Sequence, residues 1–204
     1  MSKIEPVTQP EEDGWLEAAS CGQLPGWTQA TERRRAHMSR VAELMGTWSH
    51  ALGLSDRDCK RWQAAGWLHD TLRDAEPESL RAECGSPFDA LPGSYLHGPA
   101  TAGRLERVGV RDDGVLNAIR YHTLGDARLD SLGLALIVAD YLEPGRPGRP
   151  LWRTGLRARM PAALEEVAFE VVGDRLRGSL DRGATVRAEM VELWNRLVAD
   201  ARPS

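Results

Sequence analysis

The sequence predicts an all-α fold, built as a single bundle of about seven or eight helices. Apolar residues recur at steps of three and four in several segments, which is the spacing of one helix face. No segment of useful length alternates apolar and polar residues as a half-buried strand does. The 204 residues suffice for one domain with a sizeable core. We expect an N-terminal lead-in over residues 1–30 and the bundle over residues 31–200.

The first helices of the bundle are predicted over residues 31–52 and 55–69. In the first, His37 falls on the apolar stripe. Ser55, followed three residues later by an aspartate, resembles a capping pair that opens the second. The inward face of this second helix carries His69. Both histidines are therefore expected to point into the bundle.

The middle of the chain predicts three further elements, the first a short helix over residues 77–83. His97 precedes a glycine and a proline at a probable helix start, where a side chain can lie over a pocket. Asp112 is expected to open the next helix, in which His122 is in register with apolar residues. These two histidines join the inward set.

The last predicted helices cover residues 132–142, 162–176 and 185–198. The first of them is apolar all round except for Asp140, and an ionised aspartate in that position must have a partner. Between it and the next helix, Gly, Pro and Arg predict a connection that runs to about residue 150. The lead-in mixes Pro, Gly, Glu and two tryptophans and predicts about one turn, near Trp15.

The composition excludes several classes of partner. The formal net charge of −4 gives no basic surface for nucleic acid or lipid, and the arginine runs at 33–35 and 146–157 are typical of solvated helix faces or loops. The second run follows Asp140 closely and is therefore the stronger candidate for a functional role. Three cysteines without a CxxC pair predict the reduced cytoplasm, and we expect no membrane segment. The partner is expected to be a small molecule.

The inward polar residues predict a metal centre. A single inward histidine is usually a core residue, but burying a whole set of such groups without strong partners would cost about 1 to 3 kcal/mol each. Imidazole and carboxylate ligands without thiolate suit iron, manganese, zinc, cobalt or nickel. Neighbouring residues on a helix diverge by about 100°, so a carboxylate beside one ligand can bridge toward a second ion. The candidate metal ligands are His37, His69, Asp70, His97, His122 and Asp140.

Several short motifs, in order along the chain, resemble those of the HD-domain phosphohydrolases, and in particular of their bacterial YqeK-like branch. The similarity runs from about residue 34 to residue 149 and more weakly through the C-terminal helices. The motifs are Arg35-Ala36-His37, Leu68-His69-Asp70, Leu96-His97-Gly98, Tyr121-His122-Thr123 with Gly125, and Ala139-Asp140 with Glu143-Pro144 and Arg146.

The resemblance implies a fold, a cofactor and a reaction. Members of this branch are all-helical and hydrolyse diadenosine tetraphosphate symmetrically to two ADP with a two-iron centre. By the same resemblance, Asp70 bridges one ion, held by His37, His69 and Asp140, to a second held by His97 and His122. A hydroxide shared by two ions would attack one phosphorus. Two divalent ions are therefore expected, with iron first and manganese, cobalt, nickel or zinc as alternatives.

The same comparison supplies candidate substrate contacts. Asp70 and Arg73 are the expected catalytic residues, where Arg73 stands in place of the family's usual lysine and can still bind phosphate. Arg73, Thr123 and Arg146 are the expected substrate-binding residues, although a threonine near a helix end more often caps the helix. Tyr141 replaces another usual lysine and removes one positive charge, so substrate preference could have drifted.

Other functions remain open at this level. The same ligands would serve an HD phosphohydrolase of another nucleotide or phosphoester. Two further interpretations are a non-catalytic module that binds a nucleotide or a metal and a purely structural bundle. The intact ligand set argues against both. The sequence leaves the oligomeric state undecided, including a homodimer.

Overall fold

The computed structural model describes residues 14–200, and within that range every regular element is helical and no strand occurs. The all-α prediction is confirmed, but this part of the chain holds ten α-helices rather than about seven or eight. Two short 3₁₀ turns, η1 (Phe88–Ala90) and η2 (Gly93–Tyr95), join α4 to α5. The helices are α1 (Gly14–Ser20), α2 (Glu32–Ala51), α3 (Asp56–Leu68), α4 (Pro77–Cys84), α5 (His97–Arg107), α6 (Asp113–Tyr121), α7 (Ser131–Leu142), α8 (Pro150–Arg159), α9 (Leu164–Asp181) and α10 (Ala188–Asp200).

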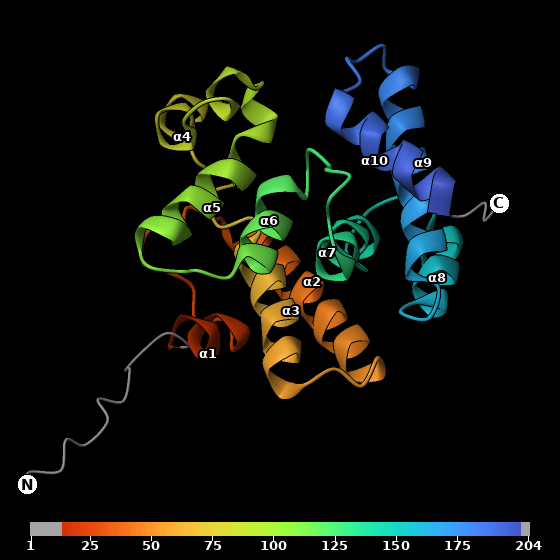
Figure 1. Ribbon diagram of the computed structural model, residues 1–204, viewed down its shortest axis with the longest axis horizontal. Coiled ribbons are helices and arrows are strands. Elements are labelled where there is room, and N and C mark those ends of the chain that lie inside the picture. The colour runs from red at the N-terminus through yellow and green to blue at the C-terminus, as the bar shows by residue number, and fades with distance from the viewer. Residues whose placement is uncertain (1–13, 201–204) are drawn as a thin grey trace, which may run out of the picture.

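Helix α7 occupies the middle of the bundle (Figure 1). It packs against α2, α3, α6 and α9 and is buried along nearly its whole length. Helices α2 and α3 pair with each other, as do α5 with α6 and α9 with α10. A second, smaller apolar cluster lies under α4 and the 3₁₀ turns. Asp140 on α7 therefore faces residues from several helices at the centre of the fold.

The ends of the first bundle helices are fixed by local chemistry. The Thr31 side chain accepts a hydrogen bond from the Arg34 N–H, and the Ser55 side chain accepts one from the Asp58 N–H, so each satisfies a free N–H group at its helix start. Gly53, after α2, has φ of 66°, the left-handed conformation that glycine adopts at least cost. Thr31 and Ser55 stand at the helix starts that the sequence predicts.

Two glycines permit the close helix contacts that bring histidines together. A Cβ on Gly66 of α3 would lie 2.6 Å from Ala42 Cα of α2. A Cβ on Gly98 of α5 would lie 2.8 Å from the carbonyl oxygen of Ile119 in α6. Real Cβ atoms do not approach so closely, so α2 with α3 and α5 with α6 depend on glycine at these contacts.

Two segments outside the predicted bundle helices are helical. The lead-in forms α1, two turns instead of one, and packs Leu16 and Ala19 against the main core beside α3; residues 1–13 of that lead-in lie outside the described residues. Residues 150–159, which follow the predicted connection and to which the sequence assigned no element, form α8. Of the residues in α8 only Leu156 is buried, so its sequence carries almost no apolar stripe from which the helix could have been predicted.

The second bundle helix also ends earlier than expected. Helix α3 closes at Leu68, His69 is its C-cap residue, and Asp70 lies in the turn that follows. Asp70 is therefore not a helical neighbour of His69. The turn, and not the 100° step between adjacent helical residues, sets the direction of the Asp70 side chain. None of the helices in residues 14–200 is long and apolar enough to cross a membrane.

Candidate metal centre

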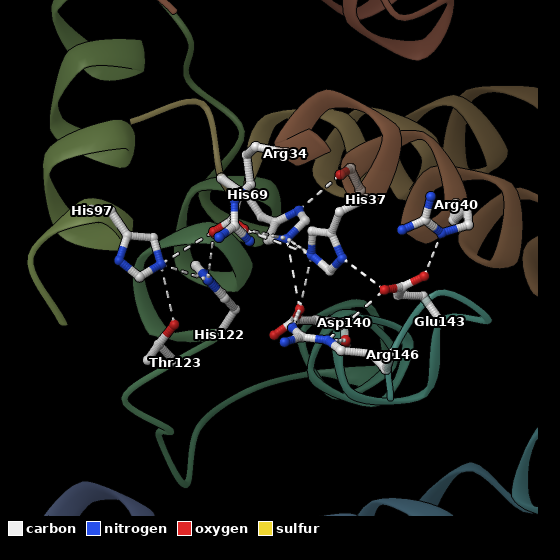
Figure 2. A network of polar contacts seen from close by, with 12 residues as sticks. Arg34, His37, Arg40, His69, His97, His122, Thr123, Asp140, Glu143 and Arg146 are labelled. Atoms are coloured by element: carbon white, nitrogen blue, oxygen red, sulfur yellow. Dashed lines mark hydrogen bonds and ion pairs between the residues drawn. The ribbon is translucent and has the colours of Figure 1, made fainter. Parts of the chain in front are cut away.

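Four histidines meet as two pairs at the centre of the bundle. His37 from α2 and His69 at the end of α3 bring their Nε2 atoms to 3.3 Å. His97 at the start of α5 and His122 at the end of α6 bring theirs to 3.1 Å. All four are buried. Figure 2 shows the two pairs next to one another, with His69 between His37 and His122.

The Asp70 carboxylate lies between the two pairs. Its Oδ2 is 3.7 Å from the Nε2 of His37 and 3.6 Å from that of His69, whereas its Oδ1 is 3.2 Å from the Nε2 of His97 and 3.6 Å from that of His122. Each oxygen thus faces a different pair. In both of the resulting three-residue groups the ligand atoms lie within 4.8 Å of one another.

Asp140 from α7 joins the first pair. Its Oδ1 is 3.1 Å from His37 Nε2 and 4.0 Å from His69 Nε2. Arg146 donates hydrogen bonds to the same carboxylate and, at 2.9 Å, to the backbone carbonyl oxygen of Asp140. The structure therefore assembles all six residues that the sequence nominated, with Asp140 on the side of His37 and His69 (Figure 2).

The outer nitrogens of three histidines are engaged, which leaves their Nε2 atoms facing inward. His37 Nδ1 lies 3.1 Å from Glu143 Oε1, His69 Nδ1 lies 2.8 Å from the Gly66 carbonyl oxygen, and His122 Nδ1 lies 2.8 Å from the Ile119 carbonyl oxygen. A carbonyl or carboxylate on Nδ1 holds the tautomer whose Nε2 lone pair is available to a metal. His97 Nδ1 is buried without a hydrogen-bond partner in residues 14–200.

The charge states of Asp70, Asp140, His69 and His97 suit metal ligands, whereas at His37 the hydrogen bonds to Asp140 and Glu143 outweigh burial and raise the pKa. Burial would raise the pKa of Asp140, but Arg146 and the hydrogen bond from His37 outweigh it and hold the pKa well below its usual range. Burial would also raise the pKa of Asp70, but His69, His122 and His97 outweigh it and hold the pKa well below its usual range. Burial lowers the pKa of His69 to about 4 and also lowers that of His97. Ionised carboxylates and neutral imidazoles are the forms that bind metal.

Glu143 supports His37 from behind. It is 2% exposed and accepts hydrogen bonds from His37, Arg40 and the Gly145 N–H. Burial alone would raise its pKa, but these three donors outweigh burial and lower the pKa to about 2. A carboxylate behind a ligating histidine fixes the ring and increases its basicity.

A cationic cavity of about 360 Å³ opens beside this half of the centre. Its wall carries four arginines together with His37 and Glu143, and Arg34 donates a hydrogen bond of 2.7 Å to Asp70 Oδ2. Arginine guanidinium groups match the geometry of phosphate oxygens. The arginines are Arg33, Arg34, Arg40 and Arg146.

The two other expected substrate contacts lie in different surroundings. Thr123 Oγ1 is 3.3 Å from His97 Nε2, beside the inner atoms of the second pair. Arg73 lies in the turn after α3, where its N–H donates a 3.0 Å hydrogen bond to the Asp70 carbonyl oxygen. Its side chain is partly buried and makes no hydrogen bond or ion pair with another residue of the described range. Arg146 both pairs with Asp140 and lines the cationic cavity.

Sequence reasoning missed Arg34, Arg40 and the supporting role of Glu143. Arg34 belongs to the run that was interpreted as a solvated face, although it lies three residues before His37 and hence on the same helix face. Glu143 was noted as part of a motif without a role. The spacing could have identified Arg34, whereas the contact between Glu143 and His37 spans 106 positions and required the fold.

The donor set fits two divalent ions better than a polar core. Carboxylate oxygen faces imidazole nitrogen throughout, no thiolate takes part, and each half offers at least three ligand atoms from buried side chains. In the first half, three histidine and carboxylate residues surround one side of Asp70; in the second, two histidines surround the other side. The shared carboxylate is the feature that a two-metal site requires.

Comparison with known proteins identifies a protein family and several relatives. The family model described as HD domain matches residues 34–145. A protein named bis(5'-nucleosyl)-tetraphosphatase, symmetrical, from Staphylococcus aureus is 33% identical over 121 residues, which cover 56% of this chain and 61% of the relative. Relatives of the same name from Bacillus subtilis and Halalkalibacterium halodurans are 31% and 32% identical, over 58% and 66% of this chain and 65% and 74% of their own lengths. The chain thus spans less than two thirds of the length of the first two relatives.

A solved structure shares the whole fold. It is described as a predicted HD superfamily hydrolase involved in NAD metabolism from Clostridium acetobutylicum. The TM-score is 0.75 at 22% identity, and the match covers 93% of this chain and 98% of that one. The arrangement of helices around the histidine pairs therefore recurs in another protein.

Proposed function

This chain belongs to the HD domain family, and we propose that it is a metal-dependent phosphohydrolase that cleaves diadenosine tetraphosphate symmetrically to two ADP. The observation that carries the proposal is the placement of Asp70, whose two oxygens face two different histidine pairs. The name shared by three relatives supports the substrate. The matched family region contains all six candidate ligands.

The proposed site holds two divalent ions. One is assigned to His37, His69, Asp70 and Asp140, the other to Asp70, His97 and His122, with iron proposed first and manganese, cobalt, nickel or zinc as alternatives. Two such ions, when bound, activate a water for attack and draw charge from the phosphate oxygens. Three of the histidines, His37, His69 and His122, would present Nε2 to the ions in a fixed direction, because their Nδ1 atoms are anchored to Glu143 and to backbone carbonyls.

The arginines of the chain serve the polyphosphate. A tetraphosphate chain carries several negative charges, and the cavity beside His37 presents Arg34 and Arg146 at its inner end. Arg73 lies near the other histidine pair, that of His97. Burial is the main cause that lowers the pKa of His97, and the positive charge of Arg73 lowers it further. We assign Arg73 to a phosphate because a partly buried guanidinium without an internal anion is suited to an incoming one. Thr123 and Arg146 are proposed to contact substrate as well.

Hydrolysis must then break the bond between the second and third phosphates. Water adds to one phosphorus, and the oxygen bridging to the other phosphorus leaves with that half, so that both products are ADP. The three thiols in the described residues are free, and we propose the reducing cytoplasm as the compartment.

Product analysis tests the proposal. Protein purified without oxygen and supplied with ferrous iron or manganese should convert diadenosine tetraphosphate to ADP alone. In water enriched in ¹⁸O, one ADP of each pair should carry the label. ATP with AMP would show that the cleavage is not symmetrical. No turnover of this substrate, with turnover of another nucleotide or phosphoester from a panel, would assign the site to a different substrate.

A further inference from the structure

We propose that a second cavity, on the side of the metal centre away from the cationic one, binds one nucleoside 5'-phosphate half of the substrate, with Arg175 as its phosphate contact. This assignment rests on the proposed function. The cavity has a volume of about 270 Å³ and lies between the segment after α6 and helices α7, α9 and α10. It is separate from the cavity lined by Arg34 and Arg146, with which it shares no lining residue.

The wall of this cavity reaches the candidate metal centre at Thr123. Tyr95 lies two residues before His97, Thr123 follows His122, and Tyr141 follows Asp140, and all three line the cavity. Thr123 also reaches 3.3 Å from His97 Nε2. A ligand in the cavity would therefore begin beside the metal ligands and extend away from them toward α10.

Arg175 places a positive charge at that junction. Its Nη1 donates to the His122 carbonyl oxygen at 3.1 Å and its Nη2 donates to the Thr123 carbonyl oxygen at 2.6 Å. A guanidinium has five N–H groups, so donors remain for a ligand. No carboxylate of residues 14–200 lies within ion-pair distance of Arg175.

The rest of the wall suits a nucleoside. Tyr95 and Tyr141 contribute aromatic surface, and Tyr141 is held in place because its hydroxyl donates a 2.6 Å hydrogen bond to Asp174. Ser179 and Thr185 add hydroxyl groups. Ligand pockets occupy roughly 300 to 1,000 Å³. This cavity, at about 270 Å³, lies just below that range, which suits one nucleoside rather than a whole dinucleotide. Aromatic side chains that flank a cationic residue are well suited to a base and its phosphate.

Filling the cavity tests the assignment without touching a metal ligand. Gly178 lies on α9 in the cavity wall, and a Cβ there would meet only the end of the Arg182 side chain, at 3.3 Å. In metal-loaded protein, Gly178→Leu is expected to weaken the binding of ADP tenfold or more and to change that of inorganic pyrophosphate less than twofold. The matched control is Gly155→Leu on the exposed face of α8, where a Cβ meets nothing, and it should change neither.

A second variant tests the cation. Arg175→Met should weaken the binding of both ADP and pyrophosphate, with two metal ions still bound per chain. Unchanged ADP affinity in Gly178→Leu, or equal loss of ADP and pyrophosphate in that variant, would overturn the nucleoside assignment. Unchanged affinities in Arg175→Met would overturn the phosphate contact.

Different results would contradict the cavity assignment and the proposed function. If the unmodified protein converts diadenosine tetraphosphate to ADP while Gly178→Leu does so with an unchanged KM, only the cavity assignment is wrong. If the unmodified protein neither hydrolyses that substrate nor binds ADP, the proposed function is wrong and the cavity assignment falls with it.

Discussion

Gly66 packs directly on the backbone of Ala42, so closely that a Cβ on Gly66 would lie 2.6 Å from Ala42 Cα and 2.8 Å from Ala42 N. This contact sets the spacing of α2 and α3. His37 lies on α2 about one turn before Ala42, and His69 lies three residues after Gly66, so the same contact sets the distance between the two imidazoles.

Gly66→Ala should therefore destabilise the protein. Alanine gains up to about 1 kcal/mol in helix propensity over glycine, but forcing the helices apart costs about 1 to 3 kcal/mol. We expect a net loss in the free energy of unfolding and weaker metal binding, measured by denaturant unfolding and metal titration. Gly155→Ala, at an exposed helical position with open space, should instead be neutral or stabilising. Equal stability of the two variants would contradict the role given to Gly66.

A bidentate ion pair holds the helix that presents His122. Arg61 on α3 donates to Asp112 through Nε at 2.6 Å and through Nη2 at 2.8 Å, and Asp112 also caps α6 by accepting from the Val115 N–H. Asp112→Asn keeps a capping side chain but loses the charge. We expect a loss of about 1.5 to 3 kcal/mol at pH 7. Asp113→Asn, the exposed neighbour, is the control and should change stability little.

The effect of Asp112→Asn should depend on pH. Burial raises the pKa of Asp112, but the hydrogen bonds from Arg61 and the Val115 N–H outweigh burial and lower the pKa below 3.8. A carboxyl whose pKa is lower in the folded state stabilises the protein above its unfolded pKa, and this contribution is lost as the pH falls through the folded value. The stability gap between the two proteins should be full at pH 6 and narrow below about pH 3.8. A gap that stays constant from pH 6 to pH 3 would exclude the ion pair as its source.

Sequence reasoning placed the candidate ligands better than the residues that support them. Periodicity placed His37, His69 and His122 on inward faces, because a buried helix face leaves a pattern that local residues display. It placed Asp70 on a helix, whereas the residue lies in the turn after α3. It missed α8, whose exposed side chains carry almost no apolar stripe. Contacts such as that of Glu143 with His37 depend on how distant helices pack and left no mark in the sequence.

Arg73 gives a test of the substrate contacts. Arg73→Met removes a cation that has no internal partner in the described residues and should lower kcat/KM for diadenosine tetraphosphate at least tenfold, with metal content unchanged. Arg73→Lys keeps the charge at the place where the resembling family has lysine and should recover most of the loss. Equal defects in the two variants would show that charge at this position is not what the reaction uses.

Glu143 gives a test of the support behind the metal ligands. Glu143→Gln removes the carboxylate from His37 Nδ1 and should weaken metal binding about 10- to 100-fold. Glu83→Gln is the control, because Glu83 is also paired with arginine, in ion pairs with Arg104 and Arg107, but lies away from the centre. Metal affinity that falls equally in both variants would point to general destabilisation instead.

Metal content measures the bridging role of Asp70 most directly. Elemental analysis of protein purified without oxygen should give two metal ions per chain, because Asp70 faces both histidine pairs. His122→Ala should keep one ion, on the side of His37, His69 and Asp140, and Asp70→Ala should lose both metal and turnover. One ion per unmodified chain, or two ions and full activity in Asp70→Ala, would contradict the two-metal site.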